Sequence, residues 1–434
     1  MSKRLRDSQW DRHGVIENML RNVKIPRMVK IAQKFDNNRI EDIPAAIRRE
    51  LGRPEIAERI RPGSSIAITV GSRGITNIAL ITREIVRIVK EIGGKPFIIP
   101  AMGSHGGGTA EGQREMIEGY GVTEEYIGAS IKSSMEVKLI GQTEDGKPTY
   151  IDKHAAEADG IIVMGRVKPH TAFRGEYESG LMKMMAIGLG KHKGAEVCHA
   201  EGFKKMAHNV TSFAKTILKN ANILFGIAII ENAYDETYKI SALTKEEIPD
   251  KEPKLLIEAK SLMPEIKFES FDILIVDRIG KNISGDGMDP NITGIYASPY
   301  ASGGPNVKSC VVLDLTDESH GNALGIGLAS FTTKRLFDKI DFDVTYPNSL
   351  TSRLSNTSRI PMVLKNDRMA IAAAIYTCSE MSGDIPRIVR IPDTAHIGEI
   401  YISESMLEEA RSKPCIEILE EPKEMEFDEN GNLF

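Results

Sequence analysis

Short apolar runs alternate with longer stretches of helical periodicity along most of the chain. Residues 65–70 read SIAITV and end in a glycine-bearing turn, and residues 78–92 then carry apolar side chains at helical spacing. Further apolar runs predict buried strands at residues 96–100, 161–164, 223–230, 271–276, 311–315 and 369–375. Strands that alternate with helices in this way are typical of an α/β fold with a largely parallel sheet.

The pattern changes near residue 268, where a charged, amphipathic stretch gives way to a new apolar run. The 434 residues also exceed what a single hydrophobic core usually supports. We therefore predict two α/β domains with mostly parallel sheets and an active-site cleft between them. The predicted parts are a catalytic, cofactor-binding domain at 1–268, an α/β domain at 269–395, and a tail at 396–434 that packs back on the first domain.

Composition and charge favour a cytoplasmic enzyme. The net charge of −5 gives no electrostatic footprint for nucleic acid or an anionic membrane, and the longest apolar runs are too short to span a bilayer. The four cysteines form no C-x-x-C pair, so neither a disulfide framework nor a zinc knuckle is indicated. Because the first residues contain no signal-peptide core, we expect reduced thiols and a small-molecule substrate, with no nucleic-acid or membrane partner; the oligomeric state stays open.

Three loops with candidate chemistry each follow a predicted strand, and they hold Arg73, His105 and His170. Loops after parallel strands share one edge of a sheet, so these side chains can converge on one site. His105 lies in a glycine-dense loop, and Pro169 fixes the backbone before His170. Two aimed imidazoles can serve as paired general bases, although each alone could equally be a solvated or hydrogen-bonded loop residue.

The most unusual segment is residues 179–190, SGLMKMMAIGLG, which sets Lys183 among apolar neighbours. Lysine in such surroundings tends to lose its proton and become nucleophilic, whereas the plain alternative is a surface lysine on a helix. His199 follows sixteen residues later, and imidazole is a good ligand for nickel or zinc.

The residues between Lys183 and His199 offer flexible backbone amides and two cations, which suit a phosphate group. A solvated basic turn is the alternative interpretation of this stretch. The residues concerned are Gly188, Gly190, Lys191 and Lys193.

This order of a histidine, a glycine-flanked lysine and a later histidine resembles the family of nickel-dependent lactate racemases, from about residue 65 to about residue 203. The resemblance implies a nickel-pincer nucleotide, the Ni(II) pyridinium-3,5-bisthiocarboxylic acid mononucleotide, covalently attached to Lys183 and ligated through nickel by His199. Other proteins must then build this cofactor, so cofactor-biosynthesis proteins are expected partners.

The resemblance also implies the reaction, which is inversion of a 2-hydroxy acid at C2 by hydride transfer to and from the cofactor. His105 and His170 would be the acid–base pair, and Arg73 would hold the substrate carboxylate as a planar two-pronged donor. Ser72, beside Arg73, is expected among the cofactor-binding residues.

A polar, glycine-hinged loop at residues 280–291 suggests the kind of substrate. Lys281, Asn282 and Asp286 lie in this loop and are candidate substrate contacts, although a merely solvated loop is the alternative. We therefore expect a 2-hydroxy acid more polar than lactate, such as malate or an aldonate like gluconate, without excluding lactate.

Two other functions compete with the racemase. A zinc-dependent hydrolase could use His105, His170 and His199 as ligands, and a non-catalytic protein could bind a nucleotide or an acid through the same loops. Metal analysis and a mass increment on Lys183 discriminate between them.

Overall fold

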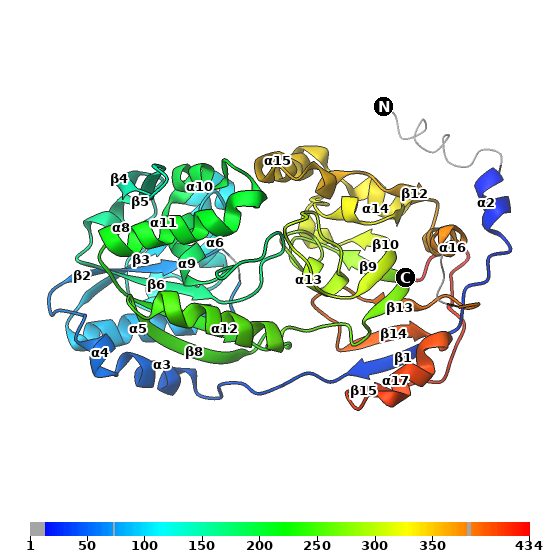
Figure 1. Ribbon diagram of the computed structural model, residues 1–434, viewed down its shortest axis with the longest axis horizontal. Helices are drawn as coiled ribbons and strands as arrows, with labels where there is room; N and C mark the ends of the chain where they lie inside the picture. The colour runs from blue at the N-terminus through cyan, green and yellow to red at the C-terminus, as the bar shows by residue number, and fades with distance from the viewer. Residues whose placement is uncertain (1–13, 73, 380–382) are drawn as a thin grey trace. The chain divides into compact units, whose positions relative to one another are not determined.

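The computed structural model describes residues 14–72, 74–379 and 383–434 (Figure 1). The chain divides into two units: unit 1 comprises Met1–Phe35 and Pro264–Phe434, and unit 2 comprises Asp36–Met263. Both units have an α/β fold with a mostly parallel sheet, as the sequence predicts.

The sheet of unit 2 runs in the order β3-β2-β6-β7-β8. The first four strands of this order are mutually parallel, and β8 pairs antiparallel with β7. Four strands confirm apolar runs read from the sequence: β2 (Ser65–Val70), β3 (Lys95–Pro100), β6 (Gly160–Arg166) and β7 (Ile223–Glu231). The fifth, β8 (Thr237–Thr244), was not predicted.

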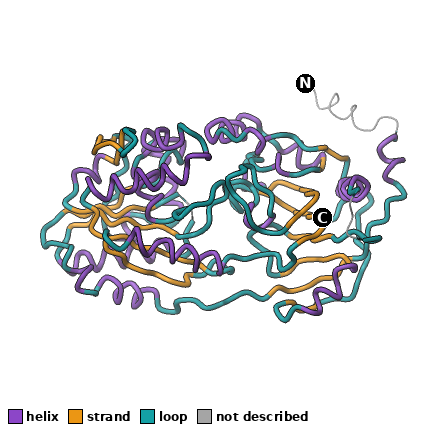
Figure 2. The backbone as a smooth tube through the Cα atoms, in the orientation of Figure 1, coloured by secondary structure: helices purple, strands orange, loops and turns teal. Residues whose placement is uncertain are grey.

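Helices cover both faces of this sheet, which explains why its strands are apolar on both sides (Figures 1 and 2). Alternate side chains of a strand point to opposite faces. Ile66, Ile68 and Val70 therefore pack against α3 (Ile43–Leu51) and α5 (Ile78–Ile92), whereas Ala67 faces the core on the other side.

That other face is covered by the segment after β6. Its elements are α9 (Leu181–Lys183), the π-helix η2 (Met184–Leu189), α10 (Lys191–His199), η3 (Phe203–Lys205), α11 (Met206–Asn220) and, after β8, α12 (Ile248–Leu262). The remaining elements of unit 2 are α4 (Pro54–Ala57), η1 (Gly106–Gly108), α6 (Ala110–Gly119), α7 (Glu124–Ile127), the hairpin of β4 (Val137–Gln142) and β5 (Pro148–Asp152), and α8 (Lys153–Glu157).

The sheet of unit 1 runs in the order β12-β11-β10-β9-β13-β14-β1-β15. Strands β12 to β13 of this order are parallel, and the last three pair antiparallel. The bounds are β1 (Met28–Gln33), β9 (Ser270–Ile279), β10 (Asn306–Leu315), β11 (Phe331–Thr333), β12 (Met362–Leu364), β13 (Ile388–Ile391), β14 (Glu399–Ser403) and β15 (Ile416–Ile418).

Helices also flank the sheet of unit 1, and its cores lie on both faces. The bounds are α2 (Val15–Leu20), α13 (Pro290–Thr293), η4 (Asp317–Ser319), η5 (Ile326–Leu328), α14 (Lys334–Lys339), α15 (Phe342–Ser352), η6 (Ser355–Ser358), α16 (Asp367–Thr377), η7 (Glu404–Met406) and α17 (Leu407–Ser412).

Residues 369–375 lie in helix α16, so the strand predicted there is wrong. The Asn366 side chain accepts a hydrogen bond from the Met369 N–H at 2.9 Å and caps the helix. Alanine is the strongest helix former, and this segment contains several. Because all of residues 369–375 are buried, the segment shows no helical periodicity that could distinguish it from a strand.

The N-terminal segment belongs to unit 1, which differs from the predicted domain at 1–268. Strand β1 lies between β14 and β15, with Met28 opposite Ser403 and Ile31 opposite Ile418. The predicted tail at 396–434 therefore pairs with the N-terminal segment within unit 1. Pairing between strands so distant in the chain leaves no local signal in the sequence.

Candidate functional site

The predicted site residues of unit 2 gather where the sheet changes direction. From β2 the chain passes through α5 to β3, whereas from β6 it passes through α9, α10 and α11 to β7 on the opposite side. Neighbouring strands with diverging connections mark the place where α/β sheets bind ligands. The Met184 side chain packs there, because a Cβ on Gly71 would lie 2.8 Å, and one on Gly165 3.7 Å, from its methyl carbon.

His105 lies in the loop after β3 and contacts the loop after β2. Its Nδ1 is 2.5 Å from the Ser72 Oγ, and the Tyr120 hydroxyl donates to the Ser72 carbonyl at 2.6 Å. The Gln113 amide donates to the carbonyls of Gly103 at 2.8 Å and His105 at 3.1 Å. The structure thus brings His105 and Ser72 together, while Arg73 lies outside the described residues.

Lys191, which the sequence offered as a phosphate-binding cation or as part of a solvated basic turn, is instead fully buried. Its Nζ donates to the Pro100 carbonyl and to the Gln113 Oε1, both at 2.7 Å, and lies 3.6 Å from an Asp152 carboxylate oxygen. Burial lowers the pKa of Lys191 and raises that of Asp152. Lys193 is exposed, and its Nζ lies 4.5 Å from the centre of the Tyr150 ring. Its ammonium group can therefore bind an anion.

His170 is half-buried in the loop after β6, and both its backbone and its ring have protein partners. The buried Glu178 accepts the His170 backbone N–H at 2.8 Å, and the Ala172 N–H donates to the imidazole Nδ1 at 3.0 Å. Lys260 on α12 donates to the second oxygen of Glu178 at 2.6 Å. These contacts fix the direction of the imidazole, as the preceding proline led us to expect.

Lys183 is half-buried at the end of α9, directly before the π-helix η2. Glu252 of α12 accepts the Met182 N–H at 3.0 Å and so holds the start of this helix. Gly180 leaves room for that carboxylate, since a Cβ there would lie 2.1 Å from its Oε1. Burial raises the pKa of Glu252 to about 8, and the N–H groups of Met182 and Leu181 oppose the shift.

His199 ends α10 and shares an aromatic neighbour with His170. The Phe203 ring centre lies 6.2 Å from that of His199 and 6.3 Å from that of His170. Burial raises the pKa of the adjacent Cys198 to about 12, and the charge of Lys183 opposes this shift more than any other charge does. His170, Lys183 and His199 therefore lie in one neighbourhood of unit 2.

The glycines between Lys183 and His199 serve packing. The Gly103 N–H donates to the Gly188 carbonyl at 3.4 Å, which joins η2 to the loop that carries His105. A Cβ on Gly188 would lie 2.7 Å from the Ala101 carbonyl oxygen, and one on Gly190 3.0 Å from the Gly194 Cα. Both positions need glycine for this close approach.

Lys281, Asn282 and Asp286 lie in unit 1, in the loop after β9. The Lys281 Nζ donates to the Gly285 carbonyl at 2.6 Å and to the Asn348 side chain at 3.1 Å. Asn282 accepts from the Thr316 hydroxyl at 2.7 Å. These contacts hold the loop against α15 and the loop after β10, and Asp286 is half-buried within it.

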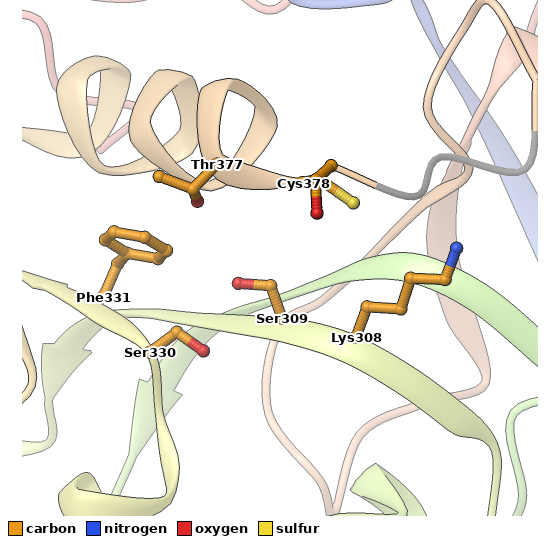
Figure 3. A pocket seen from close by; sticks show the side chains of 7 residues that line it. Lys308, Ser309, Ser330, Phe331, Thr377 and Cys378 are labelled. Carbon is orange, nitrogen blue, oxygen red and sulfur yellow. The ribbon is translucent and has the colours of Figure 1, made fainter.

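A pocket of unit 1 lies between the start of β10 and the end of α16 (Figure 3). No predicted site residue lines it: the lining residues are Lys308, Ser309, Ser330, Phe331, Thr377, Cys378 and Ser379. Among the described residues, no group of three or more His, Cys, Asp or Glu side chains is arranged to hold a metal ion. Nor does that part of the chain contain a helix with the length and apolar character to cross a membrane.

Sequence reasoning missed the buried side chains that hold the candidate loops, namely Gln113, Glu178 and Glu252. For Glu252 the sequence does contain one indication of burial, because the residue occupies an apolar position of an amphipathic helix, between Ile248 and Leu256. An acid at such a position is buried only when other groups compensate for its burial. Gln113 and Glu178 leave no comparable signal.

Comparisons with known proteins agree with the resemblance. Residues 18–211 match the family model of the lactate racemase N-terminal domain. The fold is similar to that of the lactate racemase apoprotein from Thermoanaerobacterium thermosaccharolyticum, with a TM-score of 0.51 and 15% sequence identity over 85% of this chain and 99% of that chain. No protein with a curated description matches the sequence. The segment at residues 18–211 is thus similar to the N-terminal domain of lactate racemases, and the fold of the chain is similar to that of a lactate racemase.

Proposed function

We propose that the chain is a 2-hydroxy acid racemase or epimerase that carries a nickel-pincer nucleotide on Lys183, with His199 as the nickel ligand. The observation that carries this proposal is the common neighbourhood of Lys183, His199 and His170, at the point where the sheet changes direction. The similarity of residues 18–211 to the lactate racemase N-terminal domain supports the same reaction class.

The residues present fit such a cofactor. A half-buried amine and an imidazole, both close to Cys198, provide one site for covalent attachment and one nitrogen ligand of the kind that nickel accepts. When bound, the cofactor supplies a carbon that takes up and returns a hydride. Lys193 is the cation of this segment that remains exposed for a phosphate, since Lys191 is buried.

The chain's own residues have the remaining tasks. His105 and His170 are the acid–base groups for the substrate hydroxyl, which must lose its proton when the hydride leaves the α-carbon. Ser72 orients the His105 ring through Nδ1, and Glu178 fixes the backbone of His170. Arg73, which the resemblance assigns to the substrate carboxylate, stays an expectation.

Mass spectrometry of protein from a cofactor-making host tests the attachment. We expect a mass increment that peptide mapping places on Lys183, nickel in equal amount, and loss of both in Lys183→Arg. The matched control Lys193→Arg should keep the increment, because the amine of Lys183 is still present and the arginine preserves the charge at position 193. Bound zinc and no mass increment on Lys183 would instead favour a zinc-dependent hydrolase. The match to the lactate racemase N-terminal domain speaks against that function.

For the substrate we propose an acid more polar than lactate. The support is the cluster of polar side chains in the loop after β9, where Lys281 and Asn282 have direct hydrogen-bond partners. The loaded enzyme should be assayed on lactate, malate and gluconate, with inversion followed by chiral chromatography. Turnover of lactate alone would contradict this part of the proposal and leave the reaction class intact.

A further inference from the structure

The two peptide groups that flank His199 are both held by hydrogen bonds. The last carbonyls of a helix have no partner within the helix, and His199 is the last residue of α10. Asn209 on α11 donates from Nδ2 to the Cys198 carbonyl at 2.8 Å, and the Gly202 N–H donates to the His199 carbonyl at 2.9 Å. One of these carbonyls lies in the peptide group before the His199 α-carbon and the other in the group after it. The two bonds therefore fix the backbone that carries the imidazole.

Asn209 can satisfy its contacts in one orientation of its amide. The side chain is fully buried, and its Oδ1 accepts from the Lys147 Nζ at 2.9 Å. An ammonium group can only donate and a carbonyl can only accept, so the amide must turn its oxygen to Lys147 and its nitrogen to Cys198. The contact with Lys147 thus makes Asn209 present a donor to the end of α10.

Lys147 also binds the chain on the other side of His199. Its ammonium group pairs with Glu201, two residues after His199, and lies 2.9 Å from a carboxylate oxygen of Asp145. Together with Asn209, these partners match the three N–H donors of an ammonium group. One cation is therefore connected to both sides of His199, through Asn209 on one side and through Glu201 on the other.

The turn that carries Lys147 has hydrogen bonds of its own. It joins β4 to β5, which form a two-stranded sheet packed against α10 and α11 (Figure 1). The Thr143 N–H donates to the Lys147 carbonyl and the Lys147 N–H donates to the Thr143 Oγ1, both at 2.9 Å. The Thr143 hydroxyl donates to Asp145 at 2.6 Å. The hairpin therefore places Lys147 independently of the helix end that it supports.

We propose that Asn209 and Lys147 are positioning residues for His199 as a nickel ligand. This inference rests on the proposed function. Asn209 holds the peptide group before His199, and Lys147 holds Asn209 in the orientation that this bond requires. A hydrogen bond in the interior contributes more than an ion pair at the surface, and the Glu201 side chain is exposed. Asn209 is therefore the principal support, and Glu201 a minor one.

The attachment point of the proposed cofactor has a different support. Lys183 lies at the end of α9, and Glu252 of α12 accepts the Met182 N–H at 3.0 Å. Asn209 acts instead at the end of α10. Substitution of Asn209 should therefore disturb nickel binding and leave the covalent attachment to Lys183 in place.

Hydrogen exchange of the cofactor-free protein tests the support of the helix end. Asn209→Ala leaves the Cys198 carbonyl without its buried donor, so the amides of residues 198–202 should exchange about tenfold faster, as for one hydrogen bond. Lys147→Met retains the Asn209 amide and should accelerate exchange by a smaller factor. Glu201→Gln should have the smallest effect of the three, because its ion pair is exposed.

Asn220→Ala is the matched control, because Asn220 is exposed at the far end of the same helix, and it should leave these amides unchanged. Unchanged exchange at residues 198–202 in Asn209→Ala would overturn the proposal. Faster exchange spread evenly over unit 2 would overturn it as well, since it would show a general loss of stability. If Asn209→Ala does not fold, Lys147→Met decides the question by the same measurement.

A chelator challenge of the cofactor-loaded protein tests the link to nickel. Elemental analysis follows nickel, and intact mass follows the organic part of the increment on Lys183. Asn209→Ala should lose nickel about tenfold faster than the parent, whereas the organic increment should persist. Loss of both in equal proportion would show a general structural role and contradict the positioning of His199.

A double variant separates action through His199 from an independent effect. If Asn209 acts through His199, its substitution has no further effect once the imidazole is absent. The His199→Ala/Asn209→Ala protein should therefore lose nickel at the rate of His199→Ala alone. A faster loss from the double variant would contradict the proposal.

The failure of this inference differs from the failure of the proposed function. Wild-type protein from a cofactor-making host that carries neither nickel nor an increment on Lys183 would contradict the proposed function. The exchange at the end of α10 is measured without the cofactor, so it decides the support of His199 in either case.

Discussion

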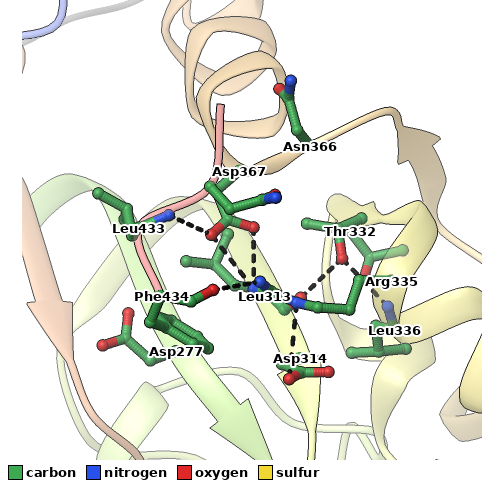
Figure 4. A network of polar contacts seen from close by, with 12 residues as sticks. Asp277, Leu313, Asp314, Thr332, Arg335, Leu336, Asn366, Asp367, Leu433 and Phe434 are labelled. Atoms are coloured by element: carbon green, nitrogen blue, oxygen red, sulfur yellow. Dashed lines mark hydrogen bonds and ion pairs between the residues drawn. The ribbon is translucent and has the colours of Figure 1, made fainter. Parts of the chain in front are cut away.

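Both units bury charged side chains beside their sheets, but these side chains stabilise different kinds of segment. In unit 1 the buried Asp367 receives the Arg335 guanidinium at 3.0 Å and the Leu433 N–H at 2.8 Å, and Arg335 also donates to the Phe434 carbonyl at 2.7 Å (Figure 4). This network ties the last residues of the chain to the sheet. In unit 2, Lys191 and Glu252 instead hold the loops and the helix that carry His105 and Lys183.

The pairing of the charges also differs. Asp367 and Asp277 in unit 1 each face a guanidinium, from Arg335 and Arg390. Glu252 in unit 2 forms no ion pair with any described residue; its partners are backbone N–H groups. Loss of a buried charge in unit 1 should therefore affect stability alone, whereas in unit 2 it should also disturb the candidate site.

The largest effect is expected for Lys191→Met. This change leaves the buried Asp152 and the Gln113 amide without their ammonium partner, and breaking a buried pair costs about 3–5 kcal/mol in the free energy of unfolding. Urea unfolding measures the loss, and loading of Lys183 should fall as well because Gln113 holds the loop of His105. The exposed Lys193→Met is the matched control and should change stability by about 0.5 kcal/mol or less.

Glu252 should make the stability of the protein depend on pH. Its pKa is about 8 in the folded protein against an ordinary value of 4.5, so between these values the folded state holds a proton that the unfolded state has released. Stability should therefore fall as the pH rises through this window, by up to about 1.4 kcal/mol per pH unit. Urea unfolding across the window measures the slope.

Glu252→Gln removes the titrating group and should flatten this dependence. Glu258→Gln lies on the same helix, where the native residue pairs with Lys239 at 2.6 Å, and should keep the parent slope. A Glu252→Gln variant with an unchanged slope would show that the carboxyl is not the source, and the contrast between the two units would lose its main support.

Arg335→Met should lower the stability of unit 1 and leave the chemistry unchanged. The variant removes the guanidinium from Asp367 and frees the Phe434 carbonyl, and hydrogen bonds to charged groups contribute about 2 kcal/mol. Thermal or urea unfolding measures this loss, while the rate per loaded enzyme should equal that of the parent. A changed rate would break the assignment of this network to stability alone.

Phe434→Ala should have the smallest effect. The ring lies 4.5 Å from the Arg335 guanidinium carbon and 4.8 Å from that of Arg278, and exposed contacts of this kind contribute about 0.5–1 kcal/mol each. Limited proteolysis of the C-terminal segment, compared with the parent, measures the release. An unchanged rate of cleavage would mean that the backbone contacts of Leu433 are sufficient.

The sequence predicts the elements of unit 2 well because their signals are local. The strand at 65–70 and the helix at 78–92 agree with β2 and α5 to the residue. The order of Lys183 and His199 also carries the resemblance to lactate racemases, with which the family-model match at residues 18–211 agrees. What the sequence cannot predict is the partner of a buried polar group, since Lys191 and Gln113, or Met182 and Glu252, lie more than 65 residues apart. For the same reason Lys191 reads as a solvated cation, although it is an interior one.

The π-helical turn η2 has a consequence for the length of the chain between Lys183 and His199. A π-helix places more residues in each turn than an α-helix, and such turns arise when one residue is added to an α-helix. Successive residues of an α-helix differ by about 100° around its axis. A single-residue deletion within residues 184–189 would therefore shift the register of the residues that follow, and we expect it to weaken the proposed nickel binding although Lys183 and His199 are both retained.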